Sequence, residues 1–114
     1  CRQIHGDFQP DNILITDSYK VVCIDWRKNF DDLVGMGDLY YDFAKCLGGL
    51  VLNYREFKNL GNGACFSLEY AINKTYIPHS QSEILIDILK NYSEYHQLDW
   101  KHIVNLTKII FINM

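Results

Sequence analysis

The sequence predicts an α+β fold that begins with a loop and a short β-hairpin and continues as a mainly helical region. Two β-rich runs stand close together before residue 27, and apolar residues recur at helical spacing after residue 38. The length of 114 residues, with 48% hydrophobic and 22% charged residues, suits one globular domain. Eight of the ten aspartates lie in the first 42 residues, whereas all four glutamates follow later. Acids that served only solubility would mix along the chain, so the first third is expected to hold a specific acidic site.

The predicted hairpin joins residues 13–16 to residues 21–26. Both runs are rich in β-branched residues, and the connection 17–20 has the composition of a short turn. Residues 27–37 contain two glycines, several acids and amides, and no sustained period, so this segment is predicted to be a loop.

The first helix is predicted from Asp38, a suitable N-cap, to about Asn53. Apolar residues follow the cap at helical spacing: Leu39, Tyr40, Phe43, Leu47 and Leu50. Gly48 and Gly49 would each weaken this helix by about 1 kcal/mol relative to alanine. Either the helix therefore packs tightly at this pair or it breaks there.

The remainder is expected to contain one strand and two helices. Apolar and polar residues alternate over 66–73, which favours a strand. Ser80 and Glu83 have the spacing of a capping box, which predicts a helix start. Its buried side is predicted to include Ile84, Ile88 and Tyr92, with Leu85 and Leu89 beside them. Asp99 is predicted to cap the last helix, whose apolar side would comprise Trp100, Ile103, Ile110, Phe111 and Met114.

Composition also excludes several classes of partner. The formal net charge is −3 without clustered Lys and Arg, which argues against a nucleic-acid or anionic-membrane surface. No apolar run approaches the roughly 20 residues of a membrane-spanning helix, and no signal peptide opens the chain. The four cysteines form no C-x-x-C pair, so they are predicted to be reduced, mostly buried thiols. These features predict a soluble, cytoplasmic protein without a membrane span or nucleic-acid partner.

The acidic first third contains a constellation suited to a divalent cation and a phosphate. Asn12 precedes the first predicted strand, and Asp25 ends the second. A tight hairpin would bring these positions side by side, so an amide oxygen and a carboxylate could face one ion, as Mg²⁺ prefers. Asp7, five residues before Asn12, could then reach an acceptor hydroxyl.

The order H-x-D-x-x-x-x-N, followed thirteen residues later by a strand-ending Asp, resembles the catalytic loop and metal-binding Asp of protein-kinase-like phosphotransferases. The closer resemblance is to the aminoglycoside phosphotransferase and choline kinase family. It rests on three ordered motifs, which are His5-Gly-Asp7, Ile24-Asp25-Trp26 and Gly37-Asp-Leu-Tyr-Tyr-Asp42-Phe-Ala44. The matched motifs cover about residues 4–45, and the rest of the chain is compatible with the helical lobe of that family.

The resemblance implies a role for each matched residue. Asp7 would be the catalytic base that accepts the proton of the substrate hydroxyl. Asn12 and Asp25 would hold the magnesium ions that bridge the nucleotide phosphates. His5 would be a scaffold residue of the loop, and Asp42 would anchor the following helix to it by hydrogen bonds. The alternatives are ordinary turn, strand-end and cap roles, which Asp and Asn often take.

Arg27 and Lys28 directly follow the implied metal ligand. The simpler interpretation is that both side chains are exposed to solvent. The alternative is a functional role, in which one of them contacts a phosphate or an anionic group of the acceptor. Four other early aspartates are interpreted as loop acids, although the third and fourth could border a substrate cleft: Asp11, Asp17, Asp31 and Asp32.

The resemblance implies an ATP- and Mg²⁺-dependent kinase that phosphorylates a hydroxyl of a small molecule such as an aminoglycoside, choline, ethanolamine or a sugar. Residues 1–114 are then expected to form a single partial domain, the C-terminal lobe of a protein-kinase-like fold. Residues 1–37 would carry the catalytic loop, hairpin and metal-binding segment, and 38–114 a helical substrate-side region. The nucleotide-binding lobe is expected to precede this piece, which alone would bind nucleotide weakly and turn over poorly. Alternatives are an inactive kinase-like interaction module and a metal-dependent phosphoesterase.

Overall fold

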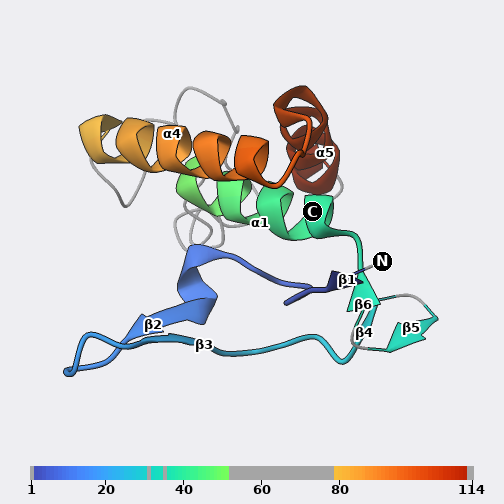
Figure 1. Ribbon diagram of the computed structural model, residues 1–114, viewed down its shortest axis with the longest axis horizontal. Helices are drawn as coiled ribbons and strands as arrows, with labels where there is room; N and C mark the ends of the chain where they lie inside the picture. The colour runs from blue at the N-terminus through green and yellow to red at the C-terminus, as the bar shows by residue number, and fades with distance from the viewer. Residues whose placement is uncertain (1, 31, 35, 52–78, 113–114) are drawn as a thin grey trace, which may run out of the picture.

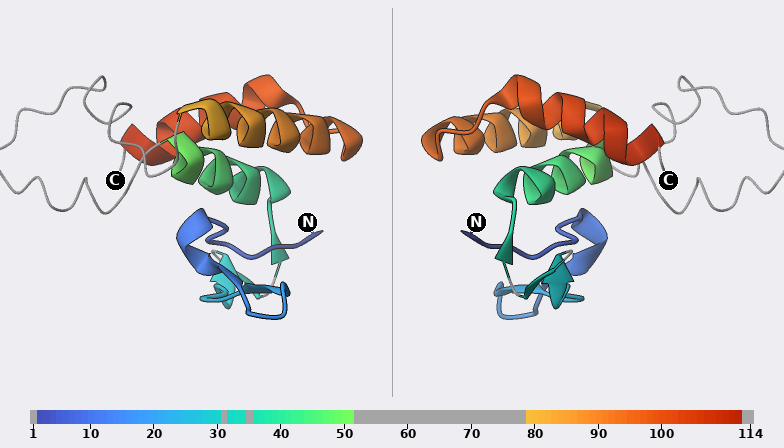
Figure 2. Two further views of the ribbon diagram at one scale, coloured as in Figure 1. Left: turned by 90° about the vertical axis from the view of Figure 1, so that its left-hand side faces the viewer. Right: turned by 90° about the vertical axis from the view of Figure 1, so that its right-hand side faces the viewer.

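The computed structural model describes residues 2–30, 32–34, 36–51 and 79–112, and these residues form three layers. Helices α4 (His79–Tyr95) and α5 (Trp100–Ile112) lie on one side of α1 (Leu39–Val51). The loop that contains the H-G-D motif and the hairpin lie on the other side (Figures 1 and 2). This arrangement is the predicted α+β fold of a helical region with a hairpin at its start. The strand predicted over 66–73 lies outside the described residues.

The predicted hairpin is confirmed, but both strands are shorter than predicted, and Asp25 lies two residues after the second strand rather than at its end. Strand β2 (Ile13–Ile15) pairs antiparallel with β3 (Val21–Cys23), with Ile13 opposite Cys23. The Tyr19 N–H bonds to the Thr16 carbonyl at 2.8 Å, and Tyr19 takes a left-handed φ of 58° to close the turn. A further backbone bond, from the Ile24 N–H to the Asn12 carbonyl at 2.9 Å, extends the pairing past both strands. The hairpin therefore fixes the backbone of residues 12 and 24 against each other.

The segment predicted to be a loop contains three two-residue strands. Strand β4 (Asn29–Phe30) pairs with β5 (Leu33–Val34), and β6 (Met36–Gly37) pairs with β1 (Arg2–Gln3). Ladders of two residues are too short to leave a side-chain period in the sequence, which is why this prediction was wrong. The β1–β6 pairing has a consequence for the site, because it returns the chain to residue 3 immediately before α1 begins.

Helix α1 begins as the sequence predicts. Asp38 accepts a hydrogen bond from the Tyr40 N–H through Oδ1 at 3.0 Å, which is the geometry of an N-cap. One side of the helix enters the apolar core, where Phe43 and Leu47 pack with the fully buried Ile103 of α5. Around them lie partly buried residues from all three helices and from the connection between α4 and α5: Leu39, Tyr40, Val51, Ile86, Leu89, Leu98, Trp100 and Val104.

The glycine pair in α1 marks tight packing rather than a break. A Cβ at Gly48 would lie 1.6 Å from Cε2 of Phe111 on α5. A Cβ at Gly49 would lie 2.3 Å from Cδ of Pro10, at the end of the H-G-D loop. Both neighbours occupy the space that any larger side chain would need, so the helix contacts α5 and the loop through its bare backbone.

Helices α4 and α5 were both predicted, but the start of α4 and its buried face differ from the prediction. Asp99 caps α5, because its Oδ1 accepts the Lys101 N–H at 2.9 Å. Helix α4 has already begun at His79, so Ser80 is not its N-cap. The predicted buried face of α4 is wrong: Ile84, Ile88 and Tyr92 are more than half exposed. The residues that face the core are Ile86, Leu89 and Ser93. Apolar residues surround much of this helix, so periodicity alone offered two candidate faces.

Two cysteines are described, and both are free thiols, Cys23 half-buried and Cys46 buried. Burial raises the pKa of the Cys46 thiol from 9.0 to about 11, and the nearby Asp42 carboxylate adds to the rise. No helix among the described residues combines the length and the apolar character needed to cross a membrane.

Because the pKa of Cys46 is raised, we expect the free energy of unfolding to fall at alkaline pH. The folded state holds the thiol proton more tightly than the unfolded chain. The contribution of the protonated thiol to the free energy of unfolding is therefore complete below pH 9.0 and is lost as the pH rises through about 11. The Cys46→Ala variant should lose about 2 kcal/mol less free energy of unfolding over this interval than the wild type. Urea unfolding at both pH values measures the difference, with Cys23→Ala as the control. Equal pH dependence of wild type and Cys46→Ala would contradict the prediction.

Candidate active site

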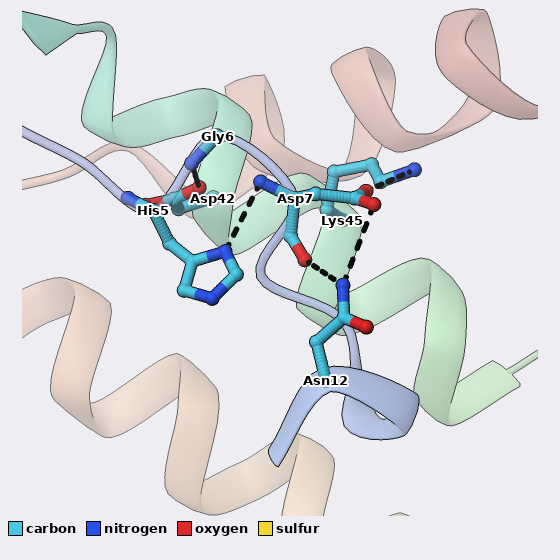
Figure 3. Close-up of polar contacts among 6 residues, drawn as sticks. All are labelled: His5, Gly6, Asp7, Asn12, Asp42 and Lys45. Carbon is cyan, nitrogen blue, oxygen red and sulfur yellow. Dashed lines mark hydrogen bonds and ion pairs between the residues drawn. The ribbon is translucent and has the colours of Figure 1, made fainter. Parts of the chain in front are cut away.

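The H-G-D loop is held against α1 by one carboxylate. Asp42 accepts the His5 N–H through Oδ2 at 2.6 Å and the Gly6 N–H through Oδ1 at 2.8 Å, and all three residues are buried (Figure 3). Gly6 has φ of +80°, a conformation that side chains rarely adopt, and a Cβ there would lie 2.8 Å from Cβ of Arg27. The loop can therefore take this path only with glycine between His5 and Asp7.

Asp7 emerges from this loop as a buried carboxylate with two neighbours. Its Oδ1 lies 2.9 Å from Nζ of Lys45, in an ion pair whose side chains are 12% and 6% exposed. In the described part of the chain Oδ1 accepts no other hydrogen bond, so the ion pair with Lys45 compensates for its burial. Its Oδ2 lies 3.4 Å from Nδ2 of Asn12, a long and weak contact. One oxygen of Asp7 is thus held by a cation, and the other is held only loosely.

Asn12 and Asp25 lie at the same end of the hairpin. Asn12 ends the single-turn 3₁₀-helix η1 (Pro10–Asn12) and donates from Nδ2 to the Asp7 carbonyl at 2.9 Å. That bond fixes the amide so that its Oδ1 remains an acceptor. Asp25 follows Ile24, the backbone partner of Asn12, and is exposed with a left-handed φ of 60°. Strained backbone at a non-glycine residue often accompanies a functional site.

The chemistry of these donors fits Mg²⁺. An amide oxygen and a carboxylate are hard ligands, and Mg²⁺ in phosphotransferases is usually held by one or two protein oxygens together with phosphates and water. No group of three or more His, Cys, Asp or Glu side chains with metal-binding geometry occurs in the part of the chain that is described. A magnesium ion here would therefore depend on Asn12, Asp25 and the nucleotide together.

His5 lies on the opposite side of the loop from Asp7. Its Nδ1 accepts the Asp7 N–H at 3.3 Å, its carbonyl accepts the Arg27 N–H at 3.0 Å, and its ring lies 4.6 Å from that of Trp26. Nε2 is buried without a partner among the described residues. The ring borders a cavity of about 380 Å³, lined mainly by apolar side chains such as Phe8 and Trp26. Asp7, Asn12 and Asp25 do not line this cavity, so it is not where the acceptor would meet the base.

The remaining predicted site residues are exposed. The aliphatic part of the Arg27 side chain packs over Gly6, and both Arg27 and Lys28 are exposed to solvent. Neither forms an ion pair with a described residue. A contact with phosphate or substrate stays a prediction for both. Three of the loop acids are also exposed, in keeping with surface roles: Asp11, Asp17 and Asp32.

Sequence reasoning missed Lys45. The signal was available in the helical spacing, because Lys45 stands one turn after Asp42 and must share its side of α1. Figure 3 shows Asp42 and Lys45 reaching from this side of the helix to consecutive parts of the loop. Gly49, one turn further, meets Pro10. This side of α1 therefore follows the loop from residue 5 to residue 10.

Comparison with known proteins adds one finding. The model of the phosphotransferase enzyme family matches residues 2–64, more than half of the chain. The match includes every residue from the H-G-D loop to the end of α1. Neither a curated protein nor a solved structure matches the chain significantly.

Proposed function

The chain belongs to the phosphotransferase enzyme family, and from this membership we propose that it forms the catalytic-loop and helical part of an ATP-dependent small-molecule kinase. The reaction would transfer the γ-phosphate of ATP to an alcohol hydroxyl of a small acceptor of the aminoglycoside, choline or sugar type. The observation that carries the proposal is the buried carboxylate of Asp7 on a loop anchored to α1 by Asp42, beside the amide of Asn12 and on the same segment as Asp25. A nucleotide-binding lobe preceding this segment would complete the active site, in a cytoplasmic protein.

Asp7 has the environment of a residue that positions a hydroxyl. The acceptor O–H would donate to the loosely held Oδ2 of Asp7, which aligns the oxygen for attack on the γ-phosphorus. As the new O–P bond forms and the bond between the β-γ bridging oxygen and the γ-phosphorus breaks, the hydroxyl proton passes to Asp7 and ADP leaves. In such reactions positioning and charge neutralisation provide most of the catalysis.

Asn12 and Asp25 would hold magnesium. The ion, when bound with the nucleotide, supplies positive charge that offsets the charge on the transferred phosphate. The bond from Nδ2 of Asn12 to the Asp7 carbonyl ties the amide ligand to the segment that carries the base. Arg27 and Lys28, exposed just after Asp25, are proposed to contact phosphate or an anionic group of the acceptor.

Replacing Asp25 with Ala tests the proposal. We expect kcat of the full-length protein to fall about 100-fold or more, since a metal ion stabilises the transition state by several kcal/mol. The midpoint of thermal unfolding should fall only slightly, because the Asp25 side chain is exposed and no described residue bonds to it, and the one cost is that Ala adopts the left-handed φ less readily than Asp. The measurement is a coupled assay of ADP formation in the presence of candidate acceptors, beside a thermal melt.

The matched control is Asp17→Ala, which removes an exposed aspartate from the turn at the other end of the hairpin. It should retain wild-type activity. Wild-type activity in Asp25→Ala would rule out its assignment as a metal ligand. Phosphate release that does not depend on an acceptor would instead favour a phosphoesterase, and no nucleotide turnover in the wild-type protein would favour an inactive interaction module.

A further inference from the structure

Lys45 is a buried cation whose ion-pair partner is the proposed base. Its residue exposure is 5%, and its Nζ lies 2.9 Å from Oδ1 of Asp7. Lysine is almost never buried unless its charge is paired, because transfer of an ammonium out of water is strongly unfavourable. The flexible stem of Lys45 therefore follows a single path from α1 to the catalytic loop, and that path ends on Asp7.

The neighbouring carboxylate on α1 does not take this role. Asp42 stands one turn before Lys45, and its two oxygens accept the backbone N–H groups of His5 and Gly6. The helix thus separates two tasks: Asp42 fixes the backbone of the loop, and Lys45 contacts the side chain that the loop presents.

The pairing also distinguishes the two oxygens of Asp7. Oδ1 faces the ammonium at 2.9 Å, whereas among the described residues Oδ2 has only the 3.4 Å contact with Nδ2 of Asn12. An ammonium at one oxygen directs the other toward the space where an acceptor hydroxyl would donate.

We propose that Lys45 is a positioning residue of the phosphotransfer site, which orients the carboxylate of Asp7 toward the acceptor hydroxyl. Lys45 acts through Asp7 and touches neither substrate. This inference rests on the proposed function, because it assigns Lys45 a part in the reaction that Asp7 would carry out.

The test is the kinetics of Lys45→Met in the full-length protein, with Lys45→Arg beside it. Loss of the ammonium should lower kcat about 100-fold, the scale of a misplaced reacting group, and leave KM for ATP within about threefold of the wild type. Lys45→Arg retains a cation and should recover at least about tenfold of that loss. Lys108→Met, which removes an exposed lysine from α5, is the control and should retain full activity.

A double variant keeps the proposal testable if Lys45→Met folds poorly. Asp7→Asn combined with Lys45→Met removes both charges, so neither partner is left buried without its counter-charge. Its melting temperature should exceed that of either single variant. Its kcat should equal that of Asp7→Asn alone within about threefold, because residues that act as a unit are not additive.

Three outcomes would overturn the inference. Wild-type kcat in folded Lys45→Met would leave Lys45 a purely structural role. A KM for ATP raised about tenfold at unchanged kcat would make it a nucleotide-binding residue, since uniform binding alone would then be lost. Absence of transfer in the wild-type protein would overturn the proposed function first, whereas an active wild type with an equally active Lys45→Met variant overturns only the role of Lys45.

Discussion

Asp7→Asn is expected to lower kcat of the full-length protein about 1,000-fold, within the range that a positioned acid or base contributes to a reaction. Asn has the shape of Asp but cannot accept the hydroxyl proton. It also leaves the ammonium of Lys45 buried without its counter-charge, so the variant should unfold at a lower temperature than the wild type. Kinetics must therefore be measured below the unfolding midpoint of the variant, with circular dichroism at the assay temperature to establish that it is folded.

The control for this variant is Asp11→Asn, four residues away on η1, where the side chain is exposed. It makes the same chemical change close to the site and should leave kcat and the melting temperature unchanged. Activity of folded Asp7→Asn close to that of Asp11→Asn would remove Asp7 from the reaction. Nucleotide binding by Asp7→Asn, measured by calorimetry with Mg-ATP, should remain near wild type, since the proposed role of Asp7 is to contact the acceptor rather than the nucleotide.

The largest loss of stability is expected for Asp42→Ala. The substitution leaves two buried backbone N–H groups, those of His5 and Gly6, without an acceptor. Each buried donor left unpaired destabilises the folded state by about 1–3 kcal/mol, so the free energy of unfolding should fall by about 4 kcal/mol in total. Urea unfolding measures this change directly. Activity should fall as well, because the loop that carries Asp7 loses its anchor on α1.

Two further variants, Asp42→Asn and Asp38→Ala, serve as comparisons for the loss of stability expected in Asp42→Ala. Asn retains one acceptor oxygen and should show about half of the loss caused by Ala. Asp38→Ala removes only the N-cap of the same helix, at a cost of about 1 kcal/mol. A loss for Asp42→Ala no larger than that for Asp38→Ala would show that the two bonds to the loop contribute little to stability.

Most elements set by local chemistry were predicted well from the sequence, with the N-cap at Ser80 as the exception. The hairpin follows from two β-rich runs and a short turn, and the caps at Asp38 and Asp99 follow from residues whose side chains bond within two positions along the chain. The ordered motifs also identified the family, because spacing in the sequence preserves the order of the catalytic loop and the hairpin.

Features set by packing between distant segments were not predicted. The ion pair of Asp7 with Lys45 joins residues 38 positions apart, and the periodicity of α1 shows only which residues share a side, not what lies opposite. The buried face of α4 was assigned wrongly because apolar residues occupy more than one of its sides. The β1–β6 pair depends on backbone hydrogen bonds between the two ends of the acidic segment, which leave no mark on residue type.

At Gly48 and Gly49 only the backbone of α1 separates α5 from the proposed catalytic loop. Phe111 packs directly on the backbone at Gly48, and Pro10 packs directly on the backbone at Gly49. Neither contact includes a side chain of α1 that could adjust its conformation. Closely packed interiors transmit displacement instead of absorbing it. A shift of α5 should therefore displace Pro10, two residues before Asn12, so the position of this proposed magnesium ligand depends on a helix nearly 100 residues away in the chain.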